Sequence, residues 1–224
     1  MNERTPSSTA QAGLQQVEAA RYALLRRLAF PMRHQVVVHL QPIGMLTEVL
    51  DRRLRAAAPD LQQVADGVAR INSLSKSAVA DVLDLITWLA PPAGATVALQ
   101  DAAQEALTLL RSNFSFRNLN LKSEVGTAPQ PIGQSASRMV LPAALIALAD
   151  AAEPPGDVVL TAQPGEDVVH LRIELRRTQG EGPMGGELPY RPLHWSDVQA
   201  LARAEDVDLE RTDSGAVLTF PTLD

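Results

Sequence analysis

The feature that most constrains the fold is a long apolar stripe between residues 61 and 89. Its members are separated by three, four or seven positions, the spacing of one helical face; they are Leu61, Val64, Val68, Ile71, Ala78, Val82, Leu85 and Leu89. A helix of roughly 30 residues is about 45 Å long. Asp60 stands directly before it and is a suitable N-cap. The stripe therefore predicts one long amphipathic helix that buries its apolar face against another element.

A second long helix is predicted over residues 24–55, and the sequence AAAPD at 56–60 turns the chain between the two. Pro31 and Pro42 are expected to interrupt or bend this helix, because each lacks the amide that donates to the carbonyl one turn back. Two helices of this length cannot bury both stripes by themselves. We therefore predict a homodimer in which two hairpins form a four-helix bundle. Packing of the stripes on the rest of the same chain is the alternative.

The pattern changes after the segment APPAGAT at 90–96. Beyond it, helical patterns near 100–116, 134–152 and 195–205 alternate with strand-like segments, which read LNLKSEV, DVVLTA, VVHLRIELRR, VDLER and AVLTF. This order predicts an α+β sandwich, in which one mixed sheet carries helices on a single face. The predicted fold class is thus α plus α/β, with a helical-hairpin domain over residues 1–90 and an α/β domain over residues 97–224.

Composition excludes several classes of protein. The net charge of −6 disfavours a nucleic-acid binder, which generally carries a basic patch. The absence of cysteine removes disulfides, thiolate metal ligands and thiol nucleophiles. The first residues lack the order of a signal peptide, and no apolar run approaches the ~20 residues that span a bilayer. We expect a cytoplasmic protein that binds neither nucleic acid nor membrane.

Two histidines five residues apart, His34 and His39, lie in the first predicted helix. On a helical wheel, six residues within roughly 40° of one direction form the predicted buried stripe: Met32, Val36, Leu40, Ile43, Thr47 and Leu50. His34 lies about 160° from Val36 and is predicted to face solvent, whereas His39 lies about 60° from the stripe centre, at its flank. His170, in a predicted strand, and His194, before a predicted helix capped by Ser196 or Asp197, are expected to be structural. His34 is therefore the candidate reactive residue.

The run HQVVVHLQPI at residues 34–43 resembles the phosphoacceptor helix of histidine kinases whose motif reads HRxKNNLQxI. It is also similar to the helix of sporulation-type histidine phosphotransferases, which begins with RHD and continues to LQ and an aliphatic residue. The residues that match without gaps are Arg33, His34, Leu40, Gln41 and Ile43. The order of elements is similar along nearly the full chain. The resemblance implies a dimeric phosphotransfer hairpin followed by a histidine-kinase-type ATPase sandwich.

The second domain departs from that family at the residues that hold nucleotide. Ala144 and Leu148 stand where the kinases place a glutamate and an asparagine that hold magnesium and nucleotide. Thr178 replaces the aspartate of the adenine-binding DxGxG, and PMGGELPYRPLHW is too short for an ordered ATP lid. Transfer from ATP needs amides and a metal to offset about three to four negative charges. Gln35 replaces the acid that serves as general base in autophosphorylation. We therefore predict a degenerate ATPase domain that holds no cofactor.

Phosphoryl exchange with a response regulator requires fewer groups on this chain than transfer from ATP does, because the receiver domain supplies its own aspartate and Mg²⁺. The resemblance thus implies a histidine phosphotransferase or pseudo-histidine-kinase of a two-component system or phosphorelay, with His34 as the phosphoacceptor. A receiver domain is the implied partner, and a sensor kinase is a second candidate partner. The residues predicted to balance the phosphoryl charge or to dock the receiver are Arg33, Val37, Val38, Gln41, Met45 and Glu48.

Two other interpretations stay open. If Pro42 is aligned with the proline of the commoner HExxxP or HDxxxP motifs, the phosphoacceptor position falls on Val37. The protein would then be a non-catalytic dimeric scaffold that binds a kinase or response regulator and modulates signalling. A weakly active ATP-dependent kinase is the third interpretation, which thermal stabilisation by Mg-ATP would support. The gapless LQxI match and the exposure of His34 on the wheel favour the first interpretation.

Overall fold

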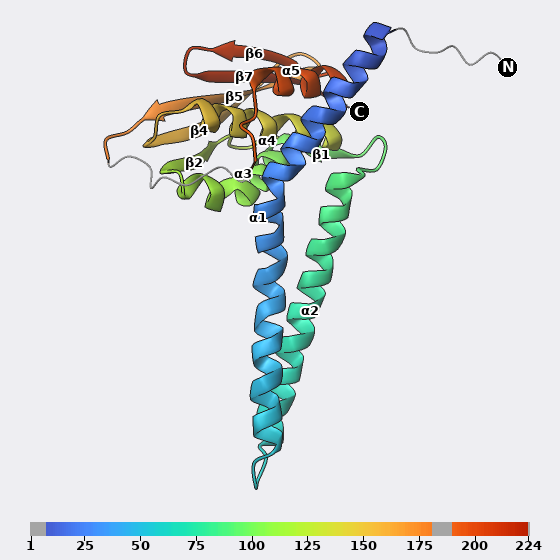
Figure 1. Ribbon diagram of the computed structural model, residues 1–224, viewed down its shortest axis with the longest axis vertical. Helices are drawn as coiled ribbons and strands as arrows, with labels where there is room; N and C mark the ends of the chain where they lie inside the picture. The colour runs from blue at the N-terminus through green and yellow to red at the C-terminus, as the bar shows by residue number, and fades with distance from the viewer. Residues whose placement is uncertain (1–7, 181–189, 224) are drawn as a thin grey trace, which may run out of the picture. The chain divides into compact units, whose positions relative to one another are not determined.

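The computed structural model describes residues 8–180 and 190–223, whose helices and strands are drawn in Figure 1. These residues form two compact units. The hairpin unit runs from Phe30 to Pro91, and the α/β unit contains the described residues up to Ala29 together with those from Pro92 onward. The predicted domain ranges place the whole of residues 1–90 in the hairpin, whereas the packing groups residues 8–29 with the α/β unit.

Both long helices of the hairpin are present. Helix α1 spans Ser8–Leu54 and helix α2 spans Leu61–Leu89. The prolines were predicted to interrupt or bend α1, and the interruption is wrong, because the helix continues through both Pro31 and Pro42. Each proline removes one backbone hydrogen bond, and a helix of this length keeps the bonds on either side. Asp60 caps α2 as predicted, since its Oδ1 accepts hydrogen bonds from the amides of Gln62 at 3.0 Å and Gln63 at 3.1 Å.

The buried stripe of α1 is displaced from its predicted direction. Met32 and Leu50 are buried as predicted, but Leu40 is 50% exposed and Thr47 is also exposed. Within the hairpin unit α1 has one neighbouring helix, so only the side of the stripe that contacts α2 is covered. The side of α1 that contacts α2 is centred closer to His39 than the helical wheel predicted for the buried stripe. Part of the predicted stripe of α1 is therefore left uncovered.

The α/β unit is built on a five-stranded mixed sheet in the order β2-β4-β5-β7-β6. The β2–β4 pair is parallel and the other neighbouring pairs are antiparallel. The strands are β2 Leu119–Glu124, β4 Gly156–Pro164, β5 Val168–Arg177, β6 Asp208–Thr212 and β7 Gly215–Pro221. A separate antiparallel pair joins β1, Thr96–Ala98, to β3, Pro131–Gly133. The predicted mixed sheet is confirmed, and the two three-residue strands are additional to it.

One face of the sheet is buried under helices α3 Leu99–Ser115, α4 Gln134–Ala151 and α5 Trp195–Ala204. On β5, Leu171 and Ile173 are fully buried while Arg172 between them is exposed. This alternation is that of a sheet with one face in the core and one in solvent. Helix α4 is the central element, because all but a few of its side chains are buried. The predicted single layer of helices agrees with this burial.

The first part of α1 completes the core of the α/β unit. Ala20, Ala23, Leu24 and Leu28 are at most 1% exposed, and they recur at helical spacing. Arg27, on the same side of the helix, is 2% exposed. Fully burying each leucine contributes about 1.5–3 kcal/mol. Residues 8–29 therefore belong to the α/β unit for an energetic reason, although they continue directly into the hairpin helix.

Candidate functional site

His34 lies on an exposed face of α1. The residues predicted to surround it share that face, because their wheel positions fall within about 60° of its direction; Arg33 lies somewhat further round at its edge. Every one of these predicted site residues is exposed: Arg33, Val37, Val38, Gln41, Met45 and Glu48. Val37, Val38 and Met45 are 41%, 49% and 64% exposed, respectively. The predicted exposure of His34 is confirmed, and a mixed polar and apolar surface, which we call the His34 face, surrounds it.

His39 is turned toward the other helix of the hairpin. Its Nε2 lies 3.4 Å from Oδ2 of Asp81 on α2, and the two side chains are 32% and 18% exposed. The predicted boundary position of His39 is therefore confirmed. Because the imidazole of His39 is held against α2, it has a structural partner that explains it. His34 and His39 thus occupy opposite sides of one helix and have different environments.

The charge around His34 is positive along the chain. Between Glu18 and Glu48 the sequence contains no acidic residue, and it contains the arginines Arg21, Arg26, Arg27 and Arg33. The guanidinium of Arg33 lies 5.5 Å from the ring centroid of Phe30, one turn before it, in a cation–π contact. Gln35, next to His34, is exposed and cannot accept a proton. The His34 face therefore offers an imidazole and a guanidinium, and the carboxylate it includes, that of Glu48, lies about 21 Å further along the helix at the usual rise.

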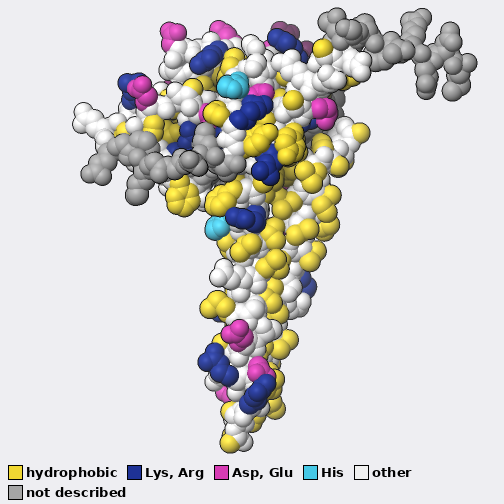
Figure 2. Space-filling model, in the orientation of Figure 1, with side chains coloured by type: hydrophobic (Ala, Val, Ile, Leu, Met, Phe, Trp, Pro, Cys, Tyr) yellow, Lys and Arg dark blue, Asp and Glu magenta, His cyan; other side chains and the backbone are white. Residues whose placement is uncertain are grey.

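A second exposed surface of the hairpin is apolar and runs along α2, where hydrophobic side chains gather in Figure 2. Its residues are each between 42% and 73% exposed: Leu61, Val68, Val79, Val82, Leu83 and Ile86. They extend over about 38 Å of helix at the usual rise. A groove of about 300 Å³ lies between α1 and α2 on this side, where Leu40 and Ile43 face Ala78, Val79 and Val82. We call this surface the apolar face of the hairpin.

The α/β unit contains a buried ion cluster that joins α1 to α4. Arg27 donates two hydrogen bonds to the carboxylate of Asp150, at 2.6 and 2.8 Å, and both side chains are 2% exposed. Arg117 donates to Oδ1 of Asp150 at 2.7 Å, and the amide of Leu193 donates to Oδ2 at 2.9 Å. Arg27 also donates to the carbonyl of Arg191 at 3.2 Å. Asp150 therefore connects four segments that are distant in the sequence.

The cluster keeps Asp150 ionised. Burial alone would raise the pKa of this carboxyl group, but the hydrogen bonds from Arg27 and Leu193 and the charges of Arg27 and Arg117 outweigh it and hold the pKa below 3.8. The pKa of Asp197 is lowered in the same way. Burial would raise it, but two hydrogen bonds from Arg191, at 2.7 and 3.0 Å, outweigh the effect of burial. These charged groups hold the α1, α4 and α5 regions together at neutral pH.

Sequence reasoning missed the Arg27–Asp150–Arg117 cluster. Its members are separated by up to 123 residues, so spacing carries no information about their contact. One signal was present, since Asp150 is the lone acid at the end of the apolar run LPAALIALADA. An acid in such a run is buried with a partner or lies at the helix end.

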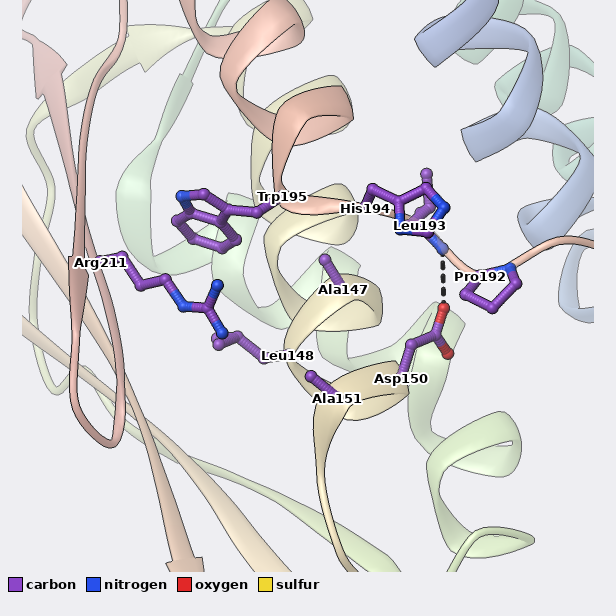
Figure 3. A pocket seen from close by; sticks show the side chains of 9 residues that line it. All are labelled: Ala147, Leu148, Asp150, Ala151, Pro192, Leu193, His194, Trp195 and Arg211. Carbon is purple, nitrogen blue, oxygen red and sulfur yellow. Dashed lines mark hydrogen bonds between the residues drawn. The ribbon is translucent and has the colours of Figure 1, made fainter.

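A pocket of about 230 Å³ lies beside the ion cluster, between α4 and the start of α5, as Figure 3 shows. It is lined by Ala147, Leu148, Asp150 and Ala151 of α4, by Pro192, Leu193, His194 and Trp195, and by Arg211 of β6. Leu148, one of the positions where the resembling kinases hold nucleotide, is 8% exposed, and Ala144 is fully buried. Neither side chain can bind a metal ion or a phosphate. We call this hollow the α4–α5 pocket.

The remaining predicted positions are structural or lie outside the described residues. Nδ1 of His170 is 2.9 Å from Oγ1 of Thr219 on the neighbouring strand, so His170 is a sheet residue as predicted. His194 precedes α5 as predicted, but the predicted cap at Ser196 or Asp197 is wrong, because His194 itself occupies the N-cap position. Asp197 is the third residue of the helix, and its Oδ2 accepts from the amide of His194 at 2.9 Å. Most of the glycine-rich segment expected in place of an ATP lid, residues 181–189, lies outside the described residues. Thr178, which is described, is exposed at the end of β5.

Across residues 8–180 and 190–223, no three His, Asp or Glu side chains stand close enough together to hold a metal ion. Among those same residues, no helix combines the length and apolar character needed to cross a membrane.

No protein-family profile and no curated protein sequence matches this chain. Solved structures of similar fold include the Acinetobacter baumannii histidine kinase AdeS, at 16% identity, 82% coverage of this chain, 98% of that one and a TM-score of 0.44. A histidine kinase from Burkholderia phymatum matches at 16% identity, with 89% and 96% coverage and a TM-score of 0.43. A bacterial phosphotransferase matches at 17% identity, with 88% and 95% coverage and a TM-score of 0.37.

Proposed function

We propose that this protein is a dimeric histidine phosphotransferase or pseudo-histidine-kinase of a two-component system, in which His34 exchanges a phosphoryl group with the aspartate of a response-regulator receiver domain. The observation that carries the proposal is the contrast between two histidines of one helix. His39 contacts Asp81 on α2, whereas His34 is presented to solvent in a stretch of chain that has no acidic residue between Glu18 and Glu48. A partner's active site can therefore reach His34 directly.

The transfer step needs little from this chain. A ring nitrogen of His34 with a free lone pair attacks the phosphorus of the receiver's aspartyl phosphate, so that an N–P bond forms while the P–O bond to the aspartate breaks. The aspartate leaves as a carboxylate, and Mg²⁺ held by the receiver offsets the charge on the phosphoryl oxygens. Arg33 is one residue away and supplies a positive charge on this side. The reverse sequence of bonds returns the phosphoryl group to a receiver.

The exposed apolar residues of the His34 face suit a docking partner. Val37, Val38 and Met45 extend over about 12 Å of helix and are bordered by Gln41 and Glu48. Methionine adapts to irregular surfaces, and the polar border favours a reversible contact over a permanent one. A receiver domain is the proposed occupant, and a sensor kinase is the other candidate.

ATP-dependent autophosphorylation is not part of this proposal. Ala144 and Leu148 are buried apolar side chains, and Gln35 cannot serve as a general base. With no side chain to hold magnesium or phosphate at those positions, the charge of a triphosphate would stay uncompensated. The proposed function therefore needs no cofactor on this chain.

Homodimerisation is the second part of the proposal, and the apolar face of the hairpin supports it. Six large aliphatic residues of α2 are exposed in one stripe, next to Leu40 and the groove of about 300 Å³. A continuous exposed stripe of this length exceeds the scattered apolar residues that are normal on a monomer. Two such hairpins packed about a two-fold axis form a four-helix bundle that covers both stripes.

The proposal is tested by phosphoryl transfer from a phosphorylated receiver domain. The purified protein is incubated with that receiver, and separately with Mg-ATP, and its intact mass is measured under alkaline conditions that preserve phosphohistidine. We expect a gain of one phosphoryl group from the receiver in the wild type and in His39→Gln, and none in His34→Gln. The His39 variant is the matched control, because it changes the other histidine of the same helix.

Each other outcome supports a different interpretation. Transfer that persists in His34→Gln would refute His34 as the phosphoacceptor. No transfer from several receivers, combined with an intact dimer, would favour the non-catalytic scaffold in which the motif is aligned on Pro42. A mass gain from Mg-ATP alone would identify an active kinase.

A further inference from the structure

The α4–α5 pocket has the composition of a binding site for a small molecule. Three small or apolar side chains of α4, Ala147, Leu148 and Ala151, line its base, and the indole of Trp195 lies opposite them (Figure 3). Arg211 extends from β6 toward Leu148, beside the ring of Trp195. The pocket therefore combines an apolar base, the indole of Trp195, the imidazole of His194 and the guanidinium of Arg211.

The charge that an incoming group would meet is positive. Asp150 is the one carboxylate among the described lining residues, and its oxygens already accept hydrogen bonds from Arg27, Arg117 and the amide of Leu193. Two guanidinium groups on one carboxylate leave this cluster with a net positive charge. The neighbouring Asp197 is likewise paired with Arg191.

Arg211 is the group positioned to recognise an anion. Its guanidinium lies 5.4 Å from the ring centroid of Trp195 in a cation–π contact. Among the residues that the structure describes, it has no acidic partner. An arginine fixed on an aromatic face keeps its donors available for a carboxylate, which it binds with two parallel hydrogen bonds.

We propose that the α4–α5 pocket binds a small planar organic acid, namely an aromatic or heteroaromatic carboxylate with one ring or two fused rings. Its ring lies between Trp195 and the α4 side chains, and its carboxylate binds Arg211. The pocket volume of about 230 Å³ limits the ligand to one or two rings, because pockets for drug-sized ligands begin near 300 Å³. This proposal does not depend on the function proposed for His34.

Binding in this pocket would also stabilise the contact with α1. The lining residues Asp150 and Leu193 belong to the hydrogen-bond cluster that holds Arg27. A ligand that binds the folded pocket and not the opened one favours the state in which this cluster is formed. The pocket is therefore a place where a metabolite acid could act on residues 8–29.

The experiment is a titration of the full-length protein followed by ¹H–¹⁵N NMR of its two indole N–H groups, Trp88 and Trp195. The probes are benzoate and indole-3-carboxylate, and the matched neutral probes are benzamide and indole-3-carboxamide. We expect indole-3-carboxylate to shift the Trp195 signal with a Kd on the order of 1 mM, while Trp88 in the hairpin unit stays unchanged. Slower amide exchange in residues 20–28 is the second expected readout.

Variants separate a built site from unspecific binding. Arg211→Gln is expected to weaken binding of the acid at least about 10-fold, as one charge-assisted hydrogen-bond pair requires. Arg172→Gln, which removes an exposed arginine from the solvent face of the sheet, is the matched control and should leave binding unchanged. Equal binding of the neutral amide, equal binding in Arg211→Gln, or no Trp195 shift at 20-fold the expected Kd would overturn the proposal. A stronger response to ADP than to either acid would also overturn it, in favour of a nucleotide.

Discussion

The hairpin unit and the α/β unit bury their apolar residues to different extents. In the α/β unit, α4 is covered on nearly all sides and residues of the sheet such as Leu171 and Phe220 are fully buried. In the hairpin, most large aliphatic residues of α2 stay more than 40% exposed. Both units have ample apolar residues, so composition does not explain the difference. An α/β layer closes over its own core, whereas two helices can each cover only one side of the other.

The largest effect is expected from removing the charge of Asp150. Asp150→Asn leaves the buried Arg27 and the partly exposed Arg117 without a counter-ion, and breaking a buried pair costs about 3–5 kcal/mol. Native-state amide exchange in α4 and β5 measures the free energy of opening this unit. Asp208→Asn, an exposed acid at the start of β6, is the control and should change that free energy little. A loss below about 1 kcal/mol in Asp150→Asn would mean that the cluster is not a structural centre.

The next effect concerns the hairpin and depends on the proposed dimer. Val79→Glu places a charge on the apolar face of both subunits and should raise the dimer Kd at least about 100-fold, since each lost aliphatic contact is worth about 1.5–3 kcal/mol. Ala80→Glu changes the neighbouring residue, which is exposed and lies about 100° further round the helix. Sedimentation velocity over a range of concentrations measures both. If Ala80→Glu dissociates the protein as strongly as Val79→Glu, the apolar face is not the interface.

A smaller effect is expected from acid on the free energy of unfolding of the α/β unit. Asp150 and Asp197 both have a pKa below 3.8 in the folded chain. In the unfolded chain these groups bind protons at higher pH, near 3.9. Their stabilisation is therefore complete above that pH and is lost as the pH falls through the lowered folded-state pKa values, by at most about 1.4 kcal/mol per pH unit for each group.

The Asp197→Asn variant tests this dependence. Urea unfolding of the α/β unit at pH values between 2.5 and 5 should show a shallower loss of stability with falling pH than in the wild type. An unchanged slope would assign the acid sensitivity of this unit to other carboxylates.

The smallest effect is expected from an exposed ion pair whose N–O distance equals that of the buried Arg27–Asp150 pair. Nη2 of Arg177 lies 2.6 Å from Oε2 of Glu153, the distance found between Arg27 and Asp150, but its two side chains are 74% and 79% exposed. Solvent screens this pair, so Glu153→Gln should change the free energy of unfolding by less than about 0.5 kcal/mol. Chemical denaturation followed by circular dichroism is sufficient to measure it. A cost near that of Asp150→Asn would show that distance, and not burial, determines the strength of ion pairs in this protein.

Features governed by local periodicity were predictable from the sequence. The helix α2, its cap at Asp60 and the strand β5 depend on residues near one another in the chain, so helix and sheet geometry fixes them. The exposure of His34 follows for the same reason, since it depends on the angle between residues of one helix. Strands β1 and β3 have three residues each, too few for a periodic pattern.

Features governed by distant contacts were not predictable. The buried side of α1 differs from the direction that the helical wheel predicted. The wheel treats all apolar residues as equally covered, whereas α2 covers only one side of α1. The contact of Arg27 with Asp150 joins residues 123 positions apart, and no spacing in the sequence predicts it. The α4–α5 pocket is likewise formed by three segments distant in the sequence.

The continuity of α1 has a consequence for how this chain can be divided. One helix contributes Leu24, Arg27 and Leu28 to the α/β core and His34 to the hairpin, so the linker at residues 90–96 is not a boundary between independent modules. A proteolytic cut in that linker would leave the two fragments associated through residues 20–28 of α1. A fragment beginning at residue 97, by contrast, would lack Arg27, one of the two arginines that donate to Asp150. Recombination or truncation at the linker would therefore remove the α1 residues that pack in the core of the α/β unit together with the hairpin.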